Sequence, residues 1–244
     1  MTLANLPTIL IVPGLRDHVE DHWQTHLERR LPNARSVAPL EHDKLSRAAR
    51  VAALDAALAA IDGPVILVAH SAGVMITVHW ARQATRPILG AVLATPADLE
   101  TPMPTPYPSI DAIRDNGWLP VPRERLPFPS LVAASRNDPL ARYERVEALA
   151  AEWGSRFVDL GEVGHLNPAS GYGEWPGALA LIGEVQAFGA GECWLRCDAR
   201  RRRAEPVPSL YLSMSDVITR QIPSPDSAQT ALYTWIDIRR TCFC

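Results

Sequence analysis

The sequence is poor in several kinds of residue, and each scarcity excludes a class of protein. Only four cysteines occur in 244 residues, all of them between Cys193 and Cys244, so the chain before them must be stable without a disulfide framework. Uninterrupted apolar runs of about 18 residues are missing, which argues against a membrane-spanning helix. A large charge excess is missing too: the net charge is −3, so the whole chain is not a polycationic binder of nucleic acid or membrane surfaces.

The beginning of the chain lacks the features of a secretory signal. Residues 1–7 contain no lysine or arginine, and the apolar run at residues 8–12 is too short for the core of a signal peptide. We therefore expect a cytoplasmic protein. What the chain does have is an apolar fraction of 47% and a charged fraction of 21%, which are ordinary for a protein with a hydrophobic core.

Short β-branched runs alternate with helical patterns over residues 1–187. The strand-like runs are apolar throughout, which is typical of a parallel sheet covered by helices on both faces. Strands are expected at residues 8–12, 35–38, 65–69, 88–95, 131–135 and 156–160, and helices at 21–31, 45–61, 72–85, 143–153 and 175–187. The pattern predicts one α/β domain, residues 3–187, built as a three-layer sandwich around a mainly parallel sheet.

Two segments depart from this alternation of strands and helices. Residues 96–129 contain nine prolines, which exclude long helices and central strands and leave either a rigid surface connection or a functional loop. Residues 188–244 contain the arginine run 200–203, scattered serine and proline, and little periodicity. We expect this tail to be disordered and dispensable, and the arginine run to be solvated rather than a nucleic-acid site. The alternative is that its apolar stretches at 210–212 and 233–238 dock on the domain.

Residues 65–73, with the sequence VILVAHSAG, are the most informative stretch. An apolar strand runs into Ser71 and a helical pattern follows, which is the arrangement of a nucleophile elbow with Ala69 in place of the usual first glycine. Small residues on either side of the serine allow the sharp turn that exposes its hydroxyl. The backbone N–H of Ala72, at the start of the helix, is then expected to bind an oxyanion. A plain helix N-cap is the alternative role of Ser71.

A nucleophilic serine needs a base that is oriented by an acid, and in α/β-hydrolases the chain order is serine, acid, histidine. Only two histidines follow Ser71, and His79 falls two turns into the next helix, so His165 is the expected base. The acid must follow a strand between the two. Asp138, directly after the run at residues 131–135, is the expected acid, and Asp98 is its competitor.

Further residues are candidates for the oxyanion site and the substrate pocket. Leu15, in the loop after the first strand, is expected to supply the second oxyanion N–H. Residues that are large enough to line a pocket are Arg16, Tyr107, Trp118, Phe128 and Trp175. The aromatic members of this set have core packing as their alternative role.

No metal ion or cofactor is expected. His18, His22 and His26 are spaced four residues apart, but they do not form the HExxH pattern, and His18 precedes the expected helix. The spacing of Cys193, Cys197 and the two C-terminal cysteines matches no common zinc knuckle.

Several longer motifs carry a resemblance to a known family. They are Ile11–Gly14, His22-Trp23, His70–Gly73, Pro127–Ser130, Ser135-x-x-Asp138-Pro139 and Gly164-His165-x-Asn167-x-x-Ser170-Gly171-x-Gly173-x-Trp175-Pro176. By these motifs the chain resembles, from about residue 8 to residue 182, the small serine hydrolases that include YdeN-type proteins and retinoblastoma-binding protein 9, within the α/β-hydrolase superfamily. The resemblance implies a compact hydrolase without a large lid domain and with Ser71, Asp138 and His165 as its triad. Residues 16–19 depart from the family pattern.

The function predicted from these residues is hydrolysis of a small ester, thioester or amide through an acyl-enzyme. The expected partner is thus a small-molecule acyl substrate, with no nucleic acid and no membrane, and no protein partner follows from the sequence. The alternative is a non-catalytic protein-binding module of the same fold, since a fold alone does not prove activity.

Overall fold

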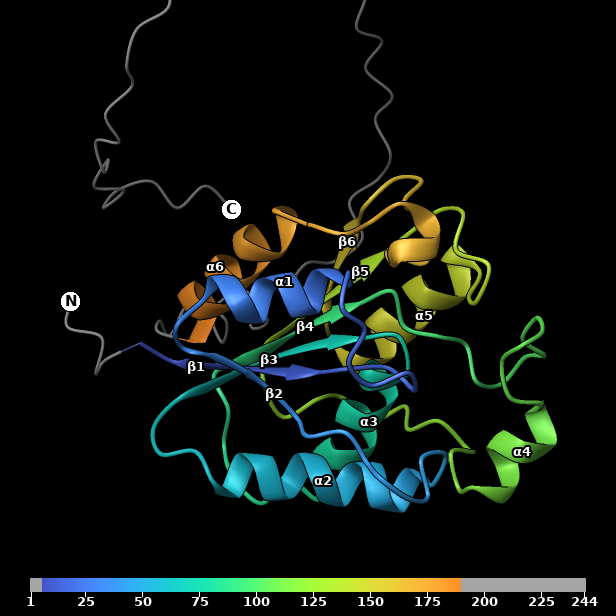
Figure 1. Cartoon of the computed structure of the whole chain (residues 1–244), viewed down its shortest axis with the longest axis horizontal. Helices are drawn as coiled ribbons and strands as arrows, with labels where there is room; N and C mark the ends of the chain where they lie inside the picture. The colour runs from blue at the N-terminus through green and yellow to red at the C-terminus, as the bar shows by residue number, and fades with distance from the viewer. Residues whose placement is uncertain (1–5, 190–244) are drawn as a thin grey trace, which may run out of the picture. The chain divides into compact units, whose positions relative to one another are not determined.

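A computed structural model describes residues 6–189 of the chain, and its centre is one parallel sheet (Figure 1). The six strands are β1 (Thr8–Val12), β2 (Ala34–Ser36), β3 (Val65–His70), β4 (Gly90–Ala94), β5 (Ser130–Ala134) and β6 (Arg156–Asp159). They lie in the order β2-β1-β3-β4-β5-β6, and every neighbouring pair is parallel. The predicted parallel sheet is therefore confirmed.

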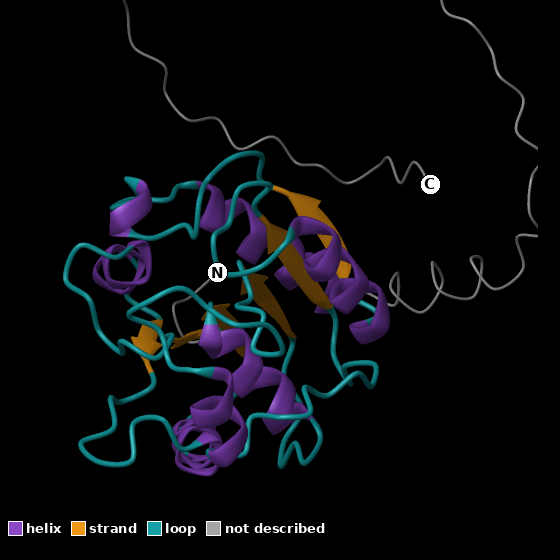
Figure 2. Ribbon diagram, turned by 90° about the vertical axis from the view of Figure 1, so that its right-hand side faces the viewer, coloured by secondary structure: helices purple, strands orange, loops and turns teal. Residues whose placement is uncertain are grey.

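Helices cover both faces of this sheet, as Figures 1 and 2 show. The helices are α1 (Trp23–Arg30), α2 (Arg47–Ala59), α3 (Ala72–Ala81), α4 (Ile110–Asp115), α5 (Tyr143–Trp153) and α6 (Gly177–Gly189). Buried side chains of α1 and α6 form one core with the sheet, and those of α2, α3 and α5 form the other. The predicted three-layer α/β architecture is confirmed.

Alternate residues of β1 show why the strands are apolar throughout. Leu10 and Val12 belong to the core beneath α2, α3 and α5, whereas Ile9 and Ile11 belong to the core beneath α1 and α6. All four are at most 2% exposed. Because neither side of the strand meets water, a polar residue at any of these positions would be buried without a partner.

Element boundaries shift from the sequence-based expectations by a few residues. The proline-rich segment contains the six-residue helix α4, whose first turn is capped by the Ser109 hydroxyl, which accepts a hydrogen bond of 3.2 Å from the Ala112 N–H. Helix α6 ends at Gly189, beyond the domain boundary expected at residue 187. Apart from residues 188 and 189, the predicted tail lies outside the described residues. Within residues 6–189, no helix combines the length and apolar character needed to cross a membrane.

The carboxyl ends of the strands bring four loops to one edge of the sheet. Gly14 follows β1, Ser71 follows β3, Asp138 follows β5 and His165 follows β6. Ligands of open parallel sheets bind outside this edge, because the loops and helix N-termini converge there. The predicted catalytic residues thus come from segments that are far apart in sequence but that share this edge.

Candidate active site

Ser71 occupies the sharp turn between β3 and α3. Its backbone has φ 57° and ψ −125°, a left-handed conformation that is unfavourable for a residue with a side chain. The turn is possible because Gly73 lies directly against β1, where a Cβ would collide with the carbonyl oxygens of Val12 and Pro13. The Ser71 side chain makes no capping hydrogen bond to α3, so a plain N-cap role is wrong and the hydroxyl is available for other contacts.

His165 joins Ser71 to Asp138. Its Nε2 lies 2.8 Å from the Ser71 Oγ, and its Nδ1 lies 2.9 Å and 3.0 Å from the two carboxylate oxygens of Asp138. The side chains of His165 and Asp138 are 4% and 3% exposed. An ionised carboxylate only accepts hydrogen bonds, so Nδ1 carries the imidazole proton and Nε2 accepts from the serine hydroxyl. In this arrangement the imidazole is positioned to accept a proton from the serine hydroxyl.

Asp98, the competing acid, has different partners. Its carboxylate accepts hydrogen bonds from the Glu100 N–H at 3.0 Å and from the Thr101 hydroxyl at 3.2 Å, and it lies 3.5 Å from Arg145 Nε. Asp138 is the carboxylate that faces His165, and one of its oxygens also accepts from the Leu140 N–H at 2.8 Å. Of the two carboxylates, Asp138 is thus the one in contact with the His165 imidazole.

The loop that carries His165 is hydrogen-bonded to the loop that carries Asp138. The Asn137 side-chain oxygen accepts hydrogen bonds from the Gly164 N–H at 2.6 Å and from the Ser135 hydroxyl at 2.9 Å. The Ser135 hydroxyl in turn accepts from the Val163 N–H at 3.2 Å. These bonds fix the two loops relative to each other, and they explain the spacing of the Ser135-x-x-Asp138 motif.

A second set of bonds fixes the His165 loop internally. The His165 N–H donates to the Ser170 hydroxyl at 3.0 Å, and that hydroxyl donates to the Asn167 side-chain oxygen at 3.1 Å. Gly164 has φ 57° and lies so close to Ser170 that a Cβ would collide with the hydroxyl. The long motif around His165 is therefore a set of groups that hold the imidazole in place.

Two further histidines, His70 and His22, lie near His165. The His70 Nε2–H donates to the His165 carbonyl oxygen at 2.9 Å, and the His70 ring lies 4.9 Å from the His165 ring and 4.6 Å from that of His22. Burial, with a smaller contribution from the neighbouring imidazoles, lowers the pKa of His70 well below its ordinary value and that of His22 to about 4. Both rings are therefore neutral at pH 7. Their presence in the family motifs was the signal that pointed to them.

A cavity of about 410 Å³ opens over Ser71. Ala72, His165 and the predicted oxyanion residue Leu15 line it together with Ser71. Six of its other residues come from the proline-rich segment, namely Ala97, Leu99, Met103, Pro106, Tyr107 and Pro108. That segment is therefore a wall of the cavity rather than only a surface connection.

The loop at Leu15 is held by a buried arginine of α2. Arg50, which is 5% exposed, donates from Nη2 to the Leu15 carbonyl oxygen at 3.1 Å and forms an ion pair with Asp17. Arg50 Nε also donates to the Lys44 carbonyl oxygen at 2.8 Å. One guanidinium thus fixes both loops that form this side of the cavity.

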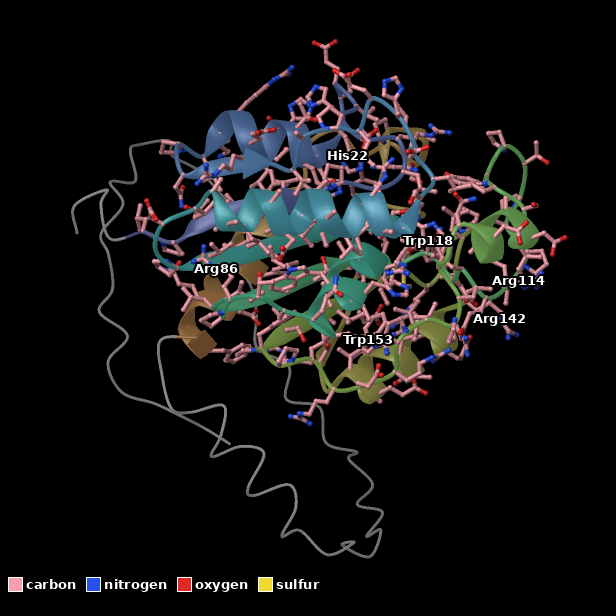
Figure 3. The ribbon with its side chains drawn as sticks, turned by 90° about the horizontal axis from the view of Figure 1, so that it is seen from below. His22, Arg86, Arg114, Trp118, Arg142 and Trp153 are labelled. Carbon is pink, nitrogen blue, oxygen red and sulfur yellow. The ribbon has the colours of Figure 1, made fainter. Side chains whose placement is uncertain are left out.

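The expected pocket residues divide between the cavity and the core. Arg16 and Tyr107 line the cavity, but Trp118 and Trp175 do not, so that expectation is corrected for both tryptophans. Trp118 is fully buried beside the start of α2 (Figure 3), where its Nε1–H donates to the Leu45 carbonyl oxygen at 2.7 Å. Trp175 packs edge-on against Trp23 with ring centroids 4.9 Å apart. Both indoles stabilise the protein through apolar packing, and that of Trp118 also satisfies its polar group there.

Phe128 also belongs to the core. It is 5% exposed, and its ring stacks on that of Trp80 at a centroid distance of 6.2 Å.

Two of the three histidines considered for a metal site have other hydrogen-bond partners. His22 caps α1 by accepting a hydrogen bond of 3.2 Å from the Gln24 N–H, and His18 Nδ1 lies 3.4 Å from the Thr25 hydroxyl. In the described part of the chain, no three histidine, cysteine or acidic side chains are grouped so that they could hold a metal ion. The four cysteines lie outside the described residues.

The chain is similar to a known protein family and to solved structures. The family model described as Serine hydrolase matches residues 9–184. A solved structure described as a YdeN-like hydrolase from Pectobacterium atrosepticum is 32% identical, with a TM-score of 0.66, and the match covers 76% of this chain and 94% of that one. No curated protein matches the sequence at a significant level.

More distant structures share the fold. The ydeN gene product of B. subtilis is 15% identical, with a TM-score of 0.59 and coverage of 75% of this chain and 100% of that one. Est1E from Butyrivibrio proteoclasticus, solved with bound ferulic acid, is 12% identical, with a TM-score of 0.57 and coverage of 77% and 89%. The family match and the 32% identical structure together show that this chain belongs to the serine hydrolase family.

Proposed function

We propose that this chain hydrolyses a small ester, thioester or amide through an acyl-enzyme formed on Ser71. The observation that carries the proposal is the line of contacts from the Ser71 hydroxyl through the His165 imidazole to the Asp138 carboxylate. Membership of the serine hydrolase family supports it.

The proposed reaction uses the three side chains in sequence. His165 Nε2 takes the hydroxyl proton while Ser71 Oγ attacks the substrate carbonyl carbon. Asp138 keeps the imidazole proton on Nδ1 and stabilises the imidazolium. The imidazolium then protonates the leaving group as its bond to the carbonyl carbon breaks. His165 finally deprotonates a water molecule, which attacks the acyl-enzyme. The imidazolium returns this proton to Ser71 Oγ as its bond to the acyl carbon breaks and the acid product leaves.

The negative charge that develops on the carbonyl oxygen needs donors that are already in place. Ala72 begins α3, and the first N–H groups of a helix have no partner within the helix. We assign this N–H and that of Leu15, across the same cavity, to the oxyanion hole. In a serine protease, the loss of one such donor costs about 10²–10³ in turnover.

The cavity supports a small substrate. Its volume of about 410 Å³ lies near the lower end of the range for small-molecule sites. Leu99, Met103 and Leu140 give it an apolar wall, which suits the alkyl or aryl part of an acyl compound.

The proposal is tested with the full chain, a fluorophosphonate probe and 4-nitrophenyl butyrate. Covalent labelling of Ser71 and release of nitrophenol are expected, and both are lost in Ser71→Ala. A non-catalytic binding module, the alternative function, would neither react with the probe nor release nitrophenol faster than buffer. That pair of negative results with a folded protein would overturn the proposal.

A further inference from the structure

The charged residues on the cavity are two cations and one carboxylate. Arg16 and Lys44, the single lysine of the sequence, line the cavity and are exposed to solvent. The carboxylate is Asp17, and Arg50 already neutralises it in an ion pair in which both side chains are at most 12% exposed. The cavity therefore offers two cations to a ligand and no uncompensated carboxylate within the described residues.

The histidines on the cavity do not alter this balance. The pKa of His22 is about 4 and that of His70 is well below the ordinary value, so both are neutral at pH 7. His165 faces Asp138 within a buried pair. The excess positive charge at the cavity thus comes from Arg16 and Lys44.

The two cations line the same cavity as the reacting groups and the apolar wall. Arg16 directly follows Leu15, and its guanidinium carbon lies 5.9 Å from the ring centroid of Tyr107, which also lines the cavity. That distance is within the range of a cation–π contact, which holds the guanidinium beside the Tyr107 ring. Lys44 is carried by the loop whose carbonyl Arg50 holds. A guanidinium and an ammonium on one cavity form a site for a carboxylate or another anion.

From these observations we infer that the substrate carries an anionic group, such as a carboxylate, in addition to the scissile carbonyl and a short apolar portion. The inference rests on the proposed hydrolase function and names its substrate class. The anionic group contacts Arg16 and Lys44 while the carbonyl lies at Ser71. Electrostatic complementarity of this kind favours the charged substrate over a neutral one of the same size.

Two matched substrate pairs test this inference and distinguish the two places where the anion can lie. Mono-4-nitrophenyl adipate and its methyl ester differ by a charge on the acyl side. 4-Butanoyloxybenzoate and 4-butanoyloxybenzamide differ by a charge on the leaving group. In each pair, kcat/KM of the full chain is divided by the rate of spontaneous hydrolysis. At least one pair is expected to show a preference of about tenfold for the anion, the size expected from one or two partly exposed charge-assisted contacts.

Variants test whether the two cations cause the preference for the anionic substrate. Arg16→Gln and Lys44→Gln are each expected to reduce the ratio of anionic to neutral substrate severalfold, and the double variant to bring it close to one. Arg35→Gln, which removes an exposed arginine on β2 that does not line the cavity, is the matched control and should keep the ratio. The preference should also fall when sodium chloride is raised from 0.05 M to 0.5 M, since salt screens exposed charges.

A binding measurement keeps this inference separate from the proposed function. Calorimetric titration of Ser71→Ala with the benzoate and benzamide pair, and with the adipate pair, gives the anion preference without turnover. Equal affinities and equal kcat/KM within both pairs would overturn the inference while leaving the hydrolase intact. A preference that survives in the double variant would also overturn it. Anion-selective binding without any turnover would retain the cation site and refute the hydrolase proposal instead.

Discussion

The floor of the cavity and its entrance are held together in different ways. The floor is formed by Ser71 and His165, with Asp138 behind His165, and the side chains of His165 and Asp138 are at most 4% exposed and fixed by hydrogen bonds between neighbouring loops. The entrance consists of Arg16, Lys44 and residues 97–108, and its two cations are exposed. Bond formation needs reacting atoms held within a fraction of an ångström, whereas selection of a substrate needs only charge and shape at the rim.

This difference predicts where substitutions act. Changes in the floor should lower the rate for every substrate, because all substrates use the same nucleophile and base. Changes at the entrance should alter the ratio between substrates. Substitutions in the two regions test this difference between rate and selectivity.

Ser71→Ala is expected to lower kcat/KM for 4-nitrophenyl butyrate by about 10⁵-fold or more, since removal of a serine nucleophile has an effect of that order in a comparable enzyme. The fold should be retained, because the Ser71 side chain makes no capping hydrogen bond and alanine keeps the Cβ that already fits the turn. Steady-state kinetics measure the loss of activity, and thermal unfolding measures whether the fold is retained. Ser155→Ala, directly before β6, is the control. Retention of most activity in Ser71→Ala would contradict the acyl-enzyme.

Asp138→Asn is expected to lower kcat/KM by about 10⁴-fold, because an amide facing Nδ1 favours the wrong imidazole tautomer. Asp98→Asn is its matched control. That carboxylate is also buried, at 4% exposed, but it faces Arg145, so its loss should change the free energy of unfolding and affect kcat/KM by no more than about threefold. Steady-state kinetics and urea unfolding of both variants separate the effects. If Asp98→Asn lost more activity than Asp138→Asn, the acid would be assigned wrongly.

The floor was largely predictable from sequence. The apolar run before Ser71 and the small residues after it determine the turn, and the chain order then leaves His165 as the base. The positions of Gly164 and Ser170 in one motif reflect contacts only a few residues apart. Short-range geometry of this kind is encoded in the spacing of residues, so the sequence alone predicts it.

The entrance was not predictable in the same way. Trp118 and Tyr107 both lie in the proline-rich segment, yet the former is fully buried and the latter lines the cavity. No sheet register or helical periodicity in that segment indicates which side chains point inward. The pairing of Arg50 with Asp17 likewise joins α2 to a distant loop, and a single sequence gives no signal for it.

Arg50 provides a sharper test because it connects the entrance to the proposed oxyanion hole. Arg50→Lys keeps the charge but loses the planar fork that reaches the Leu15 carbonyl and Asp17 together. The Leu15 N–H would then be less well placed, and kcat for a neutral ester is expected to fall about tenfold with a smaller change in KM. Steady-state kinetics measure the changes in kcat and KM separately.

The control for Arg50→Lys is Arg86→Lys. Arg86 also donates to backbone carbonyls, those of Leu58, Ile61 and Gly63, but at the opposite end of α2 (Figure 3). The Arg86→Lys substitution should lower the melting temperature and leave kcat unchanged. An equal loss of kcat in both variants would show that Arg50 acts through general stability alone.

The smallest effect concerns the neutral imidazoles beside the floor. Burial lowers the pKa of His22 to about 4 in the folded state, whereas the ordinary value is 6.5 in the unfolded chain. The unfolded state therefore binds a proton more readily between these values, so the stability from the neutral ring is complete above pH 6.5 and is lost as the pH falls toward 4. His22→Asn retains a side-chain oxygen that can cap α1, and it removes this titration. Its free energy of unfolding should therefore decrease less between pH 7 and pH 5, by about 1–2 kcal/mol. Urea unfolding at both pH values measures the difference, with exposed His42→Asn as the control. Identical pH dependence in the wild type and His22→Asn would show that the His22 ring does not resist protonation in the folded protein.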